Sequence, residues 1–335
     1  MQEARKEAVI LADAGAAAAP PTPQGWAVRR VVVTEEAAGQ RLDNFLSRHL
    51  KGVPKSRIYQ MLRTGQVRVG GRRAQPDLRL QPGDEVRIPP VRTAAPASAE
   101  PPRPGRSLLP HVVYRDDALL ALDKPAGQAV HGGSGVSLGV IEQLRLELPQ
   151  CRFLELVHRL DKDTSGLLLV ALKRPALTGL HRMLREGGVR KTYLALAVGR
   201  WRGGEREVRL ALRKYVTAEG ERRVSVHAEG QTAQTLLRPL RHYPGFTLVE
   251  ARIVTGRTHQ IRVHLASLGH PIAGDDKYGD FDLNRQLRKQ GLRRMFLHAA
   301  RLEFNHPLTG ESLSLASPLP AELERFLTGL ERPDG

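Results

Sequence analysis

A proline- and alanine-rich segment divides this chain into two parts. It reads "VRTAAPASAEPPRPGRS" from Val91 to Ser107. Such a composition cannot bury enough apolar surface to offset its ordering entropy, so it predicts a semi-rigid linker over residues 92–107. Residues 1–27 have a similar composition and predict a disordered tail. The chain is therefore expected to fold as two domains, over residues 28–91 and 108–331.

The overall composition favours a polyanionic partner. The 335 residues include 52 Lys and Arg against 35 Asp and Glu, a net charge of +17. An excess of this size is typical of proteins that bind nucleic acid. No run of about 18 uncharged apolar residues is present, so a membrane span is not expected. Cys151 is the only cysteine, which excludes an internal disulfide and fits a cytoplasmic protein.

The front part of the chain is its most basic region, with 14 Lys and Arg against 6 Asp and Glu in Arg29–Arg92. "RLDNFLSRHL" and "PKSRIYQMLRTG" predict helices, while "QVRVGGRRA" and "QPGDEVRIP" predict strands and turns. This pattern resembles the S4 RNA-binding domain, a small α/β module. The alternative is a basic domain whose arginines are only solvated. The resemblance implies RNA contacts by basic residues of the front domain: Arg41, Lys55, Arg57 and Arg63.

Beyond the linker, strand-like apolar runs outnumber helix candidates. Several runs follow one another directly, which favours an α+β domain with a mixed, largely antiparallel sheet. Neither common glycine-rich phosphate loop is present, so nucleotide-triphosphate or NAD chemistry is not indicated. The predicted strands are "HVVYRDDALLALDKP", "GLLLVALK", "TYLALAVG", "EVRLAL", "FTLVEARIV" and "HQIRVHLA". The predicted helices are Val136–Glu147, Pro175–Glu186, Asp282–Gly291 and Pro320–Leu330.

The stretch "HRLDKDTSG", from His158 to Gly166, concentrates groups that can carry chemistry. Three catalytic readings compete: a Ser/His/Asp triad, a pair of carboxylic acids, and a single carboxylate nucleophile beside a cation. Ser165 lacks a nucleophile elbow and is expected to be a turn hydroxyl or cap. Asp161 and Asp163 would share one face of an extended strand, but a turn at Thr164–Gly166 disrupts that geometry, so Asp163 is expected to be a turn-fixing residue. Asp161 then remains as the candidate nucleophile.

The histidines give no metal site. His259 and His264 are five residues apart, which places them on opposite faces of a strand. No bound metal is therefore expected. Surface or nucleic-acid contact is the expected role for most of the 12 histidines.

Four segments of the second part, in this order along the chain, resemble motifs of the RluA family of RNA pseudouridine synthases. They are "LDKPAGQAVHGG", "VHRLDKDTSGLLLVALK", "KTYLALAVG" and "VTGRTHQIRVHLASLGHPIAGDDKYG". The resemblance implies the pseudouridine synthase fold over residues 108–331. It also implies that the chain isomerises uridine in RNA. This reaction is redox-neutral and consumes no water, so no cofactor is expected.

The resemblance also implies roles for individual residues. Asp161 matches the family's nucleophile, Arg262 the arginine that pairs with it, and Tyr193 the tyrosine that stacks on the target base. Arg159 matches the arginine that fills the place of the flipped base. Attack on the sugar, addition to the base and elimination to a glycal all stay open. Further RNA contacts are expected from four basic residues: Lys124, Arg285, Arg288 and Lys289.

Two segments narrow the expected substrate. "AVHGGSGVSLGVIEQLR" and "DDKYGDFDLNRQL" resemble a branch of the family that acts on 23S ribosomal RNA, the large-subunit RNA. The alternatives are a neighbouring branch that also carries an S4 domain, a non-catalytic RNA-binding protein of ribosome assembly, and a nucleosidase that acts on free nucleosides. The expected partner is 23S ribosomal RNA or its precursor, and the protein is expected to be a monomer.

Overall fold

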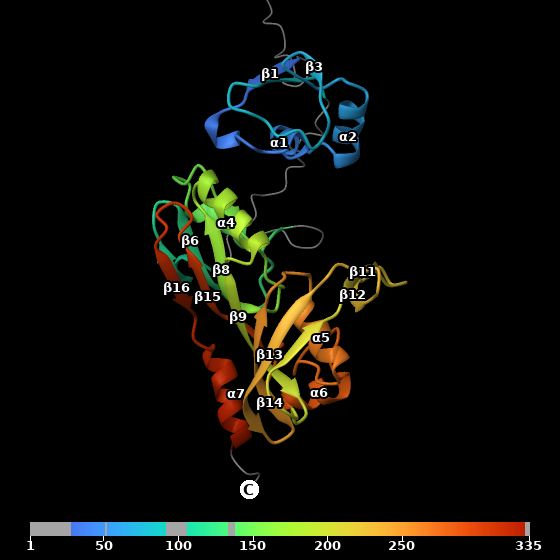
Figure 1. Ribbon diagram of the computed structural model, residues 1–335, viewed down its shortest axis with the longest axis vertical. Helices are drawn as coiled ribbons and strands as arrows, with labels where there is room; N and C mark the ends of the chain where they lie inside the picture. Colours follow the sequence, from blue (N-terminus) through green and yellow to red (C-terminus); the bar gives the residue numbers. More distant parts are fainter. Residues whose placement is uncertain (1–27, 51, 92–105, 133–137, 332–335) are drawn as a thin grey trace, which may run out of the picture. The chain divides into compact units, whose positions relative to one another are not determined.

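The computed structural model describes residues 28–50, 52–91, 106–132 and 138–331 (Figure 1). The chain separates into two compact units, residues 1–99 and residues 100–335. The predicted tail over residues 1–27 lies outside the described residues, as does most of the predicted linker over residues 92–107. Each unit is described by itself below.

The first unit is a small α/β domain. Its four strands form an antiparallel sheet in the order β1-β4-β2-β3, with the two helices packed against it through a shared core. The elements are β1 (Arg29–Val32), a 3-10 turn η1 (Glu35–Ala37), α1 (Leu42–His49), α2 (Lys55–Arg63), β2 (Arg68–Val69), β3 (Arg72–Arg73) and β4 (Glu85–Ile88).

The core of this unit follows the helical spacing of its sequence. The residues that the spacing selects are all buried: Leu42, Phe45, Leu46, Leu50, Ile58, Met61 and Leu62. Helix α2 ends at Arg63, and Gly65 follows it with a φ of 70°. That left-handed conformation suits a glycine after a helix and ends the predicted helix here.

The second unit is built on one large sheet. The sheet has ten strands, with the path β10-β13-β14-β9-β15-β8-β6-β5; β16 pairs with β15, and β7 with β8. Only β15 and β8 run parallel, so the expected mixed, largely antiparallel sheet is confirmed. The strands are β5 (Val112–Arg115), β6 (Leu119–Lys124), β7 (Glu155–Leu156), β8 (Ser165–Ala171), β9 (Arg190–Val198), β10 (Arg206–Arg209), β13 (Gln234–Tyr243), β14 (Phe246–Ile253), β15 (Leu297–Asn305) and β16 (Ser312–Ala316).

Helices and a separate hairpin complete the second unit. The hairpin of β11 (Leu212–Val216) and β12 (Arg222–Val226) forms a two-stranded sheet of its own beside the large one (Figure 1). The helices are a 3-10 turn η2 (Leu109–His111), α3 (Val140–Glu147), α4 (Arg174–Glu186), α5 (Gln260–Ser267), α6 (Phe281–Lys289) and α7 (Ala321–Glu331). The four predicted helices correspond to α3, α4, α6 and α7.

Strand β8 is buried on both faces, which explains its unbroken apolar run. Leu167 and Leu169 point into a cluster that includes Leu180 of α4. Leu168 and Val170 point into the larger cluster on the other face. Adjacent residues of a strand face opposite ways, so a strand covered on both sides needs apolar residues at every position. This strand is the rigid element that directly follows Asp161.

One predicted strand is wrong. "HQIRVHLA" forms helix α5, and Arg262 therefore lies on a helix. Residues 260–265 are all buried, so this helix has no polar face to give the usual helical period. A short apolar run of this kind cannot be assigned to strand or helix from its period alone. Strands β7, β11, β12, β13, β15 and β16 were not predicted either.

Candidate active site

The segment that carries Asp161 is a tight turn between β7 and β8. The turn is at Lys162–Asp163, and the backbone N–H of Thr164 donates to the carbonyl of Asp161 at 3.2 Å. The predicted turn at Thr164–Gly166 is therefore wrong, because β8 already begins at Ser165. Asp163 does occupy the turn. Its carboxylate lines a second cavity and makes no side-chain hydrogen bond to the backbone in the described ranges.

Lys124 holds this turn from the neighbouring strand. Its side chain is fully buried, and its Nζ donates to the carbonyls of Pro125 at 2.8 Å, Gln128 at 3.0 Å and Lys162 at 3.1 Å. Desolvation lowers the pKa of Lys124 to about 7. The prediction that Lys124 contacts RNA is therefore wrong: the residue fixes the backbone next to Asp161. Three carbonyl acceptors use the three donors of an ammonium group, which explains a lysine here.

Hydrogen bonds of two polar side chains hold the rest of the segment in place. The ring of His158 accepts the backbone N–H of Leu169 at 3.1 Å, so this histidine supports the loop. Ser165 is fully buried, accepts from Arg294 at 2.8 Å and bonds Nδ1 of His298 at 2.9 Å. The expected turn hydroxyl at Ser165 is thus a buried strand residue.

Asp161 forms an ion pair with Arg262. Nη1 of Arg262 donates to Oδ2 of Asp161 at 3.1 Å, while the side chains are 5% and 20% exposed. The other edge of the guanidinium forms a bidentate pair with Asp275. Nε donates to Oδ2 at 2.8 Å and Nη2 donates to Oδ1 at 2.7 Å. A planar guanidinium suits this two-sided role, because its donors point along two edges.

The charge of Arg262 is secured by its partners. Burial by itself would lower its pKa, but the hydrogen bonds and charge of Asp275, together with Asp161, raise it above the ordinary arginine value. Asp275 is fully buried, and the hydrogen bonds of Arg262 lower its pKa against the opposing effect of burial. Asp161 therefore faces a permanent cation.

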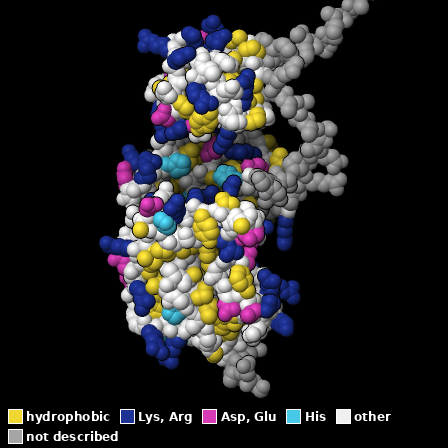
Figure 2. Space-filling model, turned by 90° about the vertical axis from the view of Figure 1, so that its right-hand side faces the viewer, with side chains coloured by type: hydrophobic (Ala, Val, Ile, Leu, Met, Phe, Trp, Pro, Cys, Tyr) yellow, Lys and Arg dark blue, Asp and Glu magenta, His cyan; other side chains and the backbone are white. Residues whose placement is uncertain are grey.

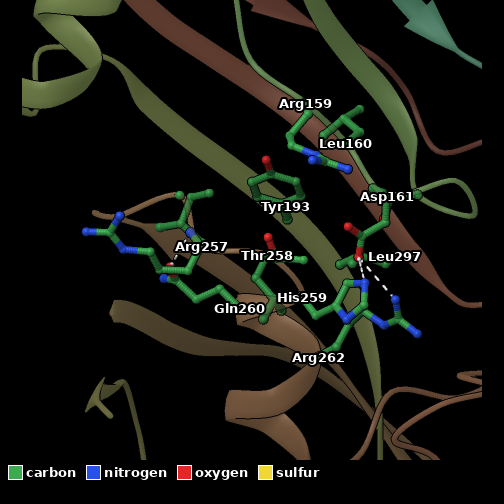
Figure 3. A pocket seen from close by; sticks show the side chains of 14 residues that line it. Arg159, Leu160, Asp161, Tyr193, Arg257, Thr258, His259, Gln260, Arg262 and Leu297 are labelled. Carbon is green, nitrogen blue, oxygen red and sulfur yellow. Dashed lines mark hydrogen bonds and ion pairs between the residues drawn. The ribbon is translucent and has the colours of Figure 1, made fainter. Parts of the chain in front are cut away.

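One cavity contains the side chains that were predicted to act together. Arg159, Asp161, Tyr193 and Arg262 all line it. Asp161, His259 and Arg262 lie together at one end, and Tyr193 lies beside them toward Arg159 (Figure 3). Tyr193 is 6% exposed, and burial raises the pKa of its phenol. Side chains from three distant parts of the sequence thus meet at one place, and their roles remain predictions.

The sequence analysis assigned no role in this cavity to three residues that the structure brings to it: Asp275, His259 and Tyr278. Asp275 orients Arg262 as described above. Nε2 of His259 lies 3.9 Å from Oδ2 of Asp161, and its Nδ1 lies 2.7 Å from the hydroxyl of Tyr278. Asp275 and Tyr278 belong to "AGDDKYG", which was quoted only for its resemblance. The number of charged residues could not identify Asp275 as the partner of Arg262. The two are 13 positions apart, and only the fold brings them together.

The prediction that His259 and His264 lie on opposite faces of a strand is wrong, because this segment forms helix α5. His259 precedes α5 and His264 lies within it. His264 is fully buried and bonds Thr235 and the carbonyl of Leu210. Over the described ranges, no three His, Cys, Asp or Glu side chains are grouped so that they could hold a metal ion.

The other predicted RNA contacts lie on the surfaces of the two units, where Lys and Arg side chains are widespread (Figure 2). Lys55, Arg57 and Arg63 are exposed on α2, whereas Arg41 is half-buried and pairs with Asp43 at 2.8 Å. On α6, three basic residues share an exposed face, and the first also pairs with Asp282: Arg285, Arg288 and Lys289. Within the described part of the chain, no helix is long and apolar enough to cross a membrane.

Two family comparisons match separate parts of the chain. Residues 118–267 match the family described as RNA pseudouridylate synthase. Residues 40–86 match the S4 domain family. The first range includes Asp161, Tyr193 and Arg262, and the second lies within the basic first unit.

Curated relatives match nearly the whole chain. The chain is 51% identical over 315 residues to ribosomal large subunit pseudouridine synthase C of Escherichia coli (strain K12), covering 90% of this chain and 97% of the relative. It is 50% identical over 308 residues to the protein of the same name from Pasteurella multocida (strain Pm70), with 91% and 94% covered.

Solved structures support the same assignment. The human RNA pseudouridylate synthase domain containing 4 protein aligns with a TM-score of 0.56 and 28% identity over 68% of this chain and 96% of the human chain. The human domain containing 1 protein aligns with a TM-score of 0.53 and 29% identity over 67% and 96%. With its S4 domain and its Asp161-centred cavity, the chain belongs to the RluA-type family of RNA pseudouridine synthases.

Proposed function

We propose that this enzyme isomerises specific uridines to pseudouridine in 23S ribosomal RNA or its large-subunit precursor, with Asp161 as the nucleophile. The observation that carries the proposal is the Asp161–Arg262 ion pair at 3.1 Å, in a cavity that Tyr193 and Arg159 also line. The relatives named ribosomal large subunit pseudouridine synthase C support the choice of RNA.

The reaction needs no external reactant. The bond between N1 of uracil and C1′ of ribose breaks, the base turns, and a bond forms between C5 and C1′. The proton lost from C5 is balanced by the proton gained at N1, so the product is an isomer of the substrate. The protein has to supply a carboxylate for the reactive sugar or base and a cavity that limits access of water.

Asp161 is placed to supply that carboxylate. Arg262 donates to its Oδ2, while its Oδ1 has no hydrogen-bond partner in the described ranges. The free oxygen is therefore the one that approaches the substrate. The buried pair of Arg262 and Asp275 holds the guanidinium in place, so little rearrangement is needed when the substrate arrives.

Arg159 and Tyr193 are suited to two steps of base flipping: filling the place that the base leaves and holding the flipped base. A uridine in folded RNA has to leave its stack before it reaches Asp161, which costs a few kcal/mol. Arg159 is exposed at the cavity, and its planar guanidinium can replace the base in the stack. The ring of Tyr193 lines the cavity and can stack on the flipped uracil, which contributes about 1–3 kcal/mol.

The S4 domain is proposed to anchor the RNA. Its exposed Lys55, Arg57 and Arg63 can neutralise phosphates, and tethering raises the concentration of RNA near the catalytic unit. The proposal includes a monomer in the cytoplasm.

The proposal is tested by mapping pseudouridines in 23S ribosomal RNA from three kinds of cells: with the intact protein, without it, and with Asp161→Asn. Specific sites should be modified with the intact protein and unmodified in the other two. An identical map in all three would contradict the proposal and favour a non-catalytic ribosome-assembly protein.

The neighbouring branch and the nucleosidase make different predictions. A map with the sites that enzymes of the neighbouring S4-containing branch modify, in place of the sites of synthase C, would assign the chain to that branch. Release of free uracil from nucleosides by the purified protein would favour a nucleosidase.

A further inference from the structure

His259 has the only positive φ angle of any non-glycine residue in the described part of the chain. Its φ of 54° and ψ of 21° lie in the left-handed region, which strains a residue with a side chain. It immediately precedes α5, whose first residue, Gln260, bonds the hydroxyl of Thr255 and the backbone of Arg257. Strain that persists at a functional cavity points to a use for the position of this ring.

The hydroxyl of Tyr278 determines which ring nitrogen of His259 carries the proton. The hydroxyl oxygen accepts the backbone N–H of Val224 at 2.9 Å and lies 2.7 Å from Nδ1 of His259. If Nδ1 accepts, the hydroxyl proton is used. If Nδ1 donated, that proton would have no protein partner in the described ranges, so the arrangement that uses every donor has Nδ1 as the acceptor. Burial lowers the pKa of His259, and the neutral ring therefore carries its proton on Nε2.

Tyr278 is held in this position by the hairpin β11–β12. Val224 lies on β12, and Nη1 of Arg223 on the same strand donates to the carbonyl of Lys277 at 3.1 Å. Nζ of Lys277 also pairs with Glu221 at 2.6 Å. These contacts hold Lys277 and the hydroxyl of Tyr278 against the hairpin.

The proton on Nε2 faces the reacting carboxylate. Nε2 lies 3.9 Å from Oδ2 of Asp161, the same oxygen to which Arg262 donates. Two donors therefore approach Oδ2 from two side chains (Figure 3). Oδ1 receives neither of them, and a rotation of the carboxylate about its Cβ–Cγ bond would carry Oδ2 away from both donors.

We infer that His259 is a positioning residue: with its proton held on Nε2 by Tyr278, it confines Oδ2 of Asp161 to the Arg262 side and leaves Oδ1 to meet the substrate. The inference rests on the proposed function of Asp161. A neutral donor suits this task, because a second full cation would weaken the carboxylate as a nucleophile.

Two variants of the full chain test this inference. His259→Asn removes the imidazole but keeps a residue that tolerates the left-handed conformation. Tyr278→Phe keeps the ring, which lies against Arg262, and removes only the hydroxyl. The matched control is Tyr243→Phe, which removes the hydroxyl of a half-buried tyrosine outside the cavity.

Kinetics on a 23S RNA fragment and nitrogen-15 spectra of the histidine rings provide the measurements. We expect kcat to fall on the order of tenfold in both variants, with KM changed less than about twofold. In the intact protein the His259 spectrum should show the Nε2–H tautomer, and Tyr278→Phe should shift it toward Nδ1–H. The control should match the intact protein in both measurements.

An Nδ1–H tautomer in the intact protein would overturn the inference, and so would an unchanged kcat in Tyr278→Phe. A raised KM with unchanged kcat would also overturn it, because His259 would then serve only RNA binding. If His259→Asn does not fold, Tyr278→Phe decides the kinetic test. An intact protein that forms no pseudouridine would contradict the proposed function itself, and the tautomer would then be the remaining test of the inference.

Discussion

At the residue scale, the cavity depends on two linked ion pairs, Asp161–Arg262 and Arg262–Asp275. The sequence reveals only the first of them. Asp161, Tyr193 and Arg262 could be selected because each lies in a motif that resembles the family. Asp275 could not, because its effect depends on a bidentate contact formed by the fold. Lys124 was misread as an RNA contact for a similar reason. A lysine after a strand looks exposed until the carbonyls that surround it are known.

Because Arg262 pairs with both Asp161 and Asp275, Arg262→Ala should lose both stability and activity. Removal of the guanidinium leaves Asp275 buried without its cation, which should cost about 3–5 kcal/mol of unfolding free energy. Turnover should be lost as well. Arg257→Ala, at an exposed arginine of the same cavity, is the control and should lose less than about 1 kcal/mol. Equal denaturation midpoints for the two variants would contradict the account.

His158 predicts a pH dependence of stability. Burial lowers its pKa to about 4 from an unfolded value of about 6.5, so the unfolded chain binds the extra proton between these values. Stability from this group is therefore complete above pH 6.5 and lost as the pH falls toward 4, roughly 3 kcal/mol in all. His158→Gln can still accept the N–H of Leu169 but does not titrate. Denaturant unfolding from pH 4.5 to 7 should show a weaker pH dependence in this variant, and parallel curves would contradict the assignment.

At the element scale, periodicity predicted the amphipathic helices but failed for the buried ones. Helices α1, α2, α4 and α6 each have a polar face, and all were expected. Helix α5 has none over residues 260–265 and was taken for a strand. Strand β13 was missed because Pro239 lies within it, where a proline is unfavourable. The pairing of β13 with β14 shifts register between Pro239 and Arg241, and this irregularity accommodates the proline.

The parallel pairing of β8 with β15 depends on Gly166. Its φ is 103°, and a Cβ atom there would lie 2.3 Å from the carbonyl oxygen of Ala299. Gly166→Ala should therefore destabilise the protein by several times the cost at Gly187, which has a φ of 79° and open space around it. Gly187→Ala isolates the conformational cost, about 1–2 kcal/mol. Thermal unfolding of both variants measures the difference, and similar melting temperatures would contradict the close approach of the two strands.

At the scale of the whole molecule, the charge of +17 is divided between two units with different tasks. The first unit concentrates exposed cations on a small α/β domain, and the second contains the cavity. Composition predicted this division and the polyanionic partner, because both follow from simple counts. The chemistry itself could not be predicted from charge and came from the motifs around Asp161.

This division predicts separate effects on RNA binding and turnover. Lys55→Gln combined with Arg63→Gln should weaken RNA binding and reduce the steepness of its salt dependence by about 0.7–0.9 per lost phosphate contact. The value of kcat at saturating RNA should stay unchanged. Arg182→Gln with Arg185→Gln, at two exposed arginines of α4, is the charge-matched control. Equal weakening by the two pairs would mean that the S4 domain contributes no more than general charge.

The most direct test of the central claim is the amount of pseudouridine that Asp161→Asn forms in a 23S RNA fragment at saturating protein. Asparagine preserves the shape of the side chain but removes the nucleophile. We predict no detectable product and RNA affinity close to that of the intact protein, whereas Arg159→Ala should weaken RNA engagement. Product formed by Asp161→Asn at a rate near that of the intact protein would contradict the assignment of Asp161 as the nucleophile.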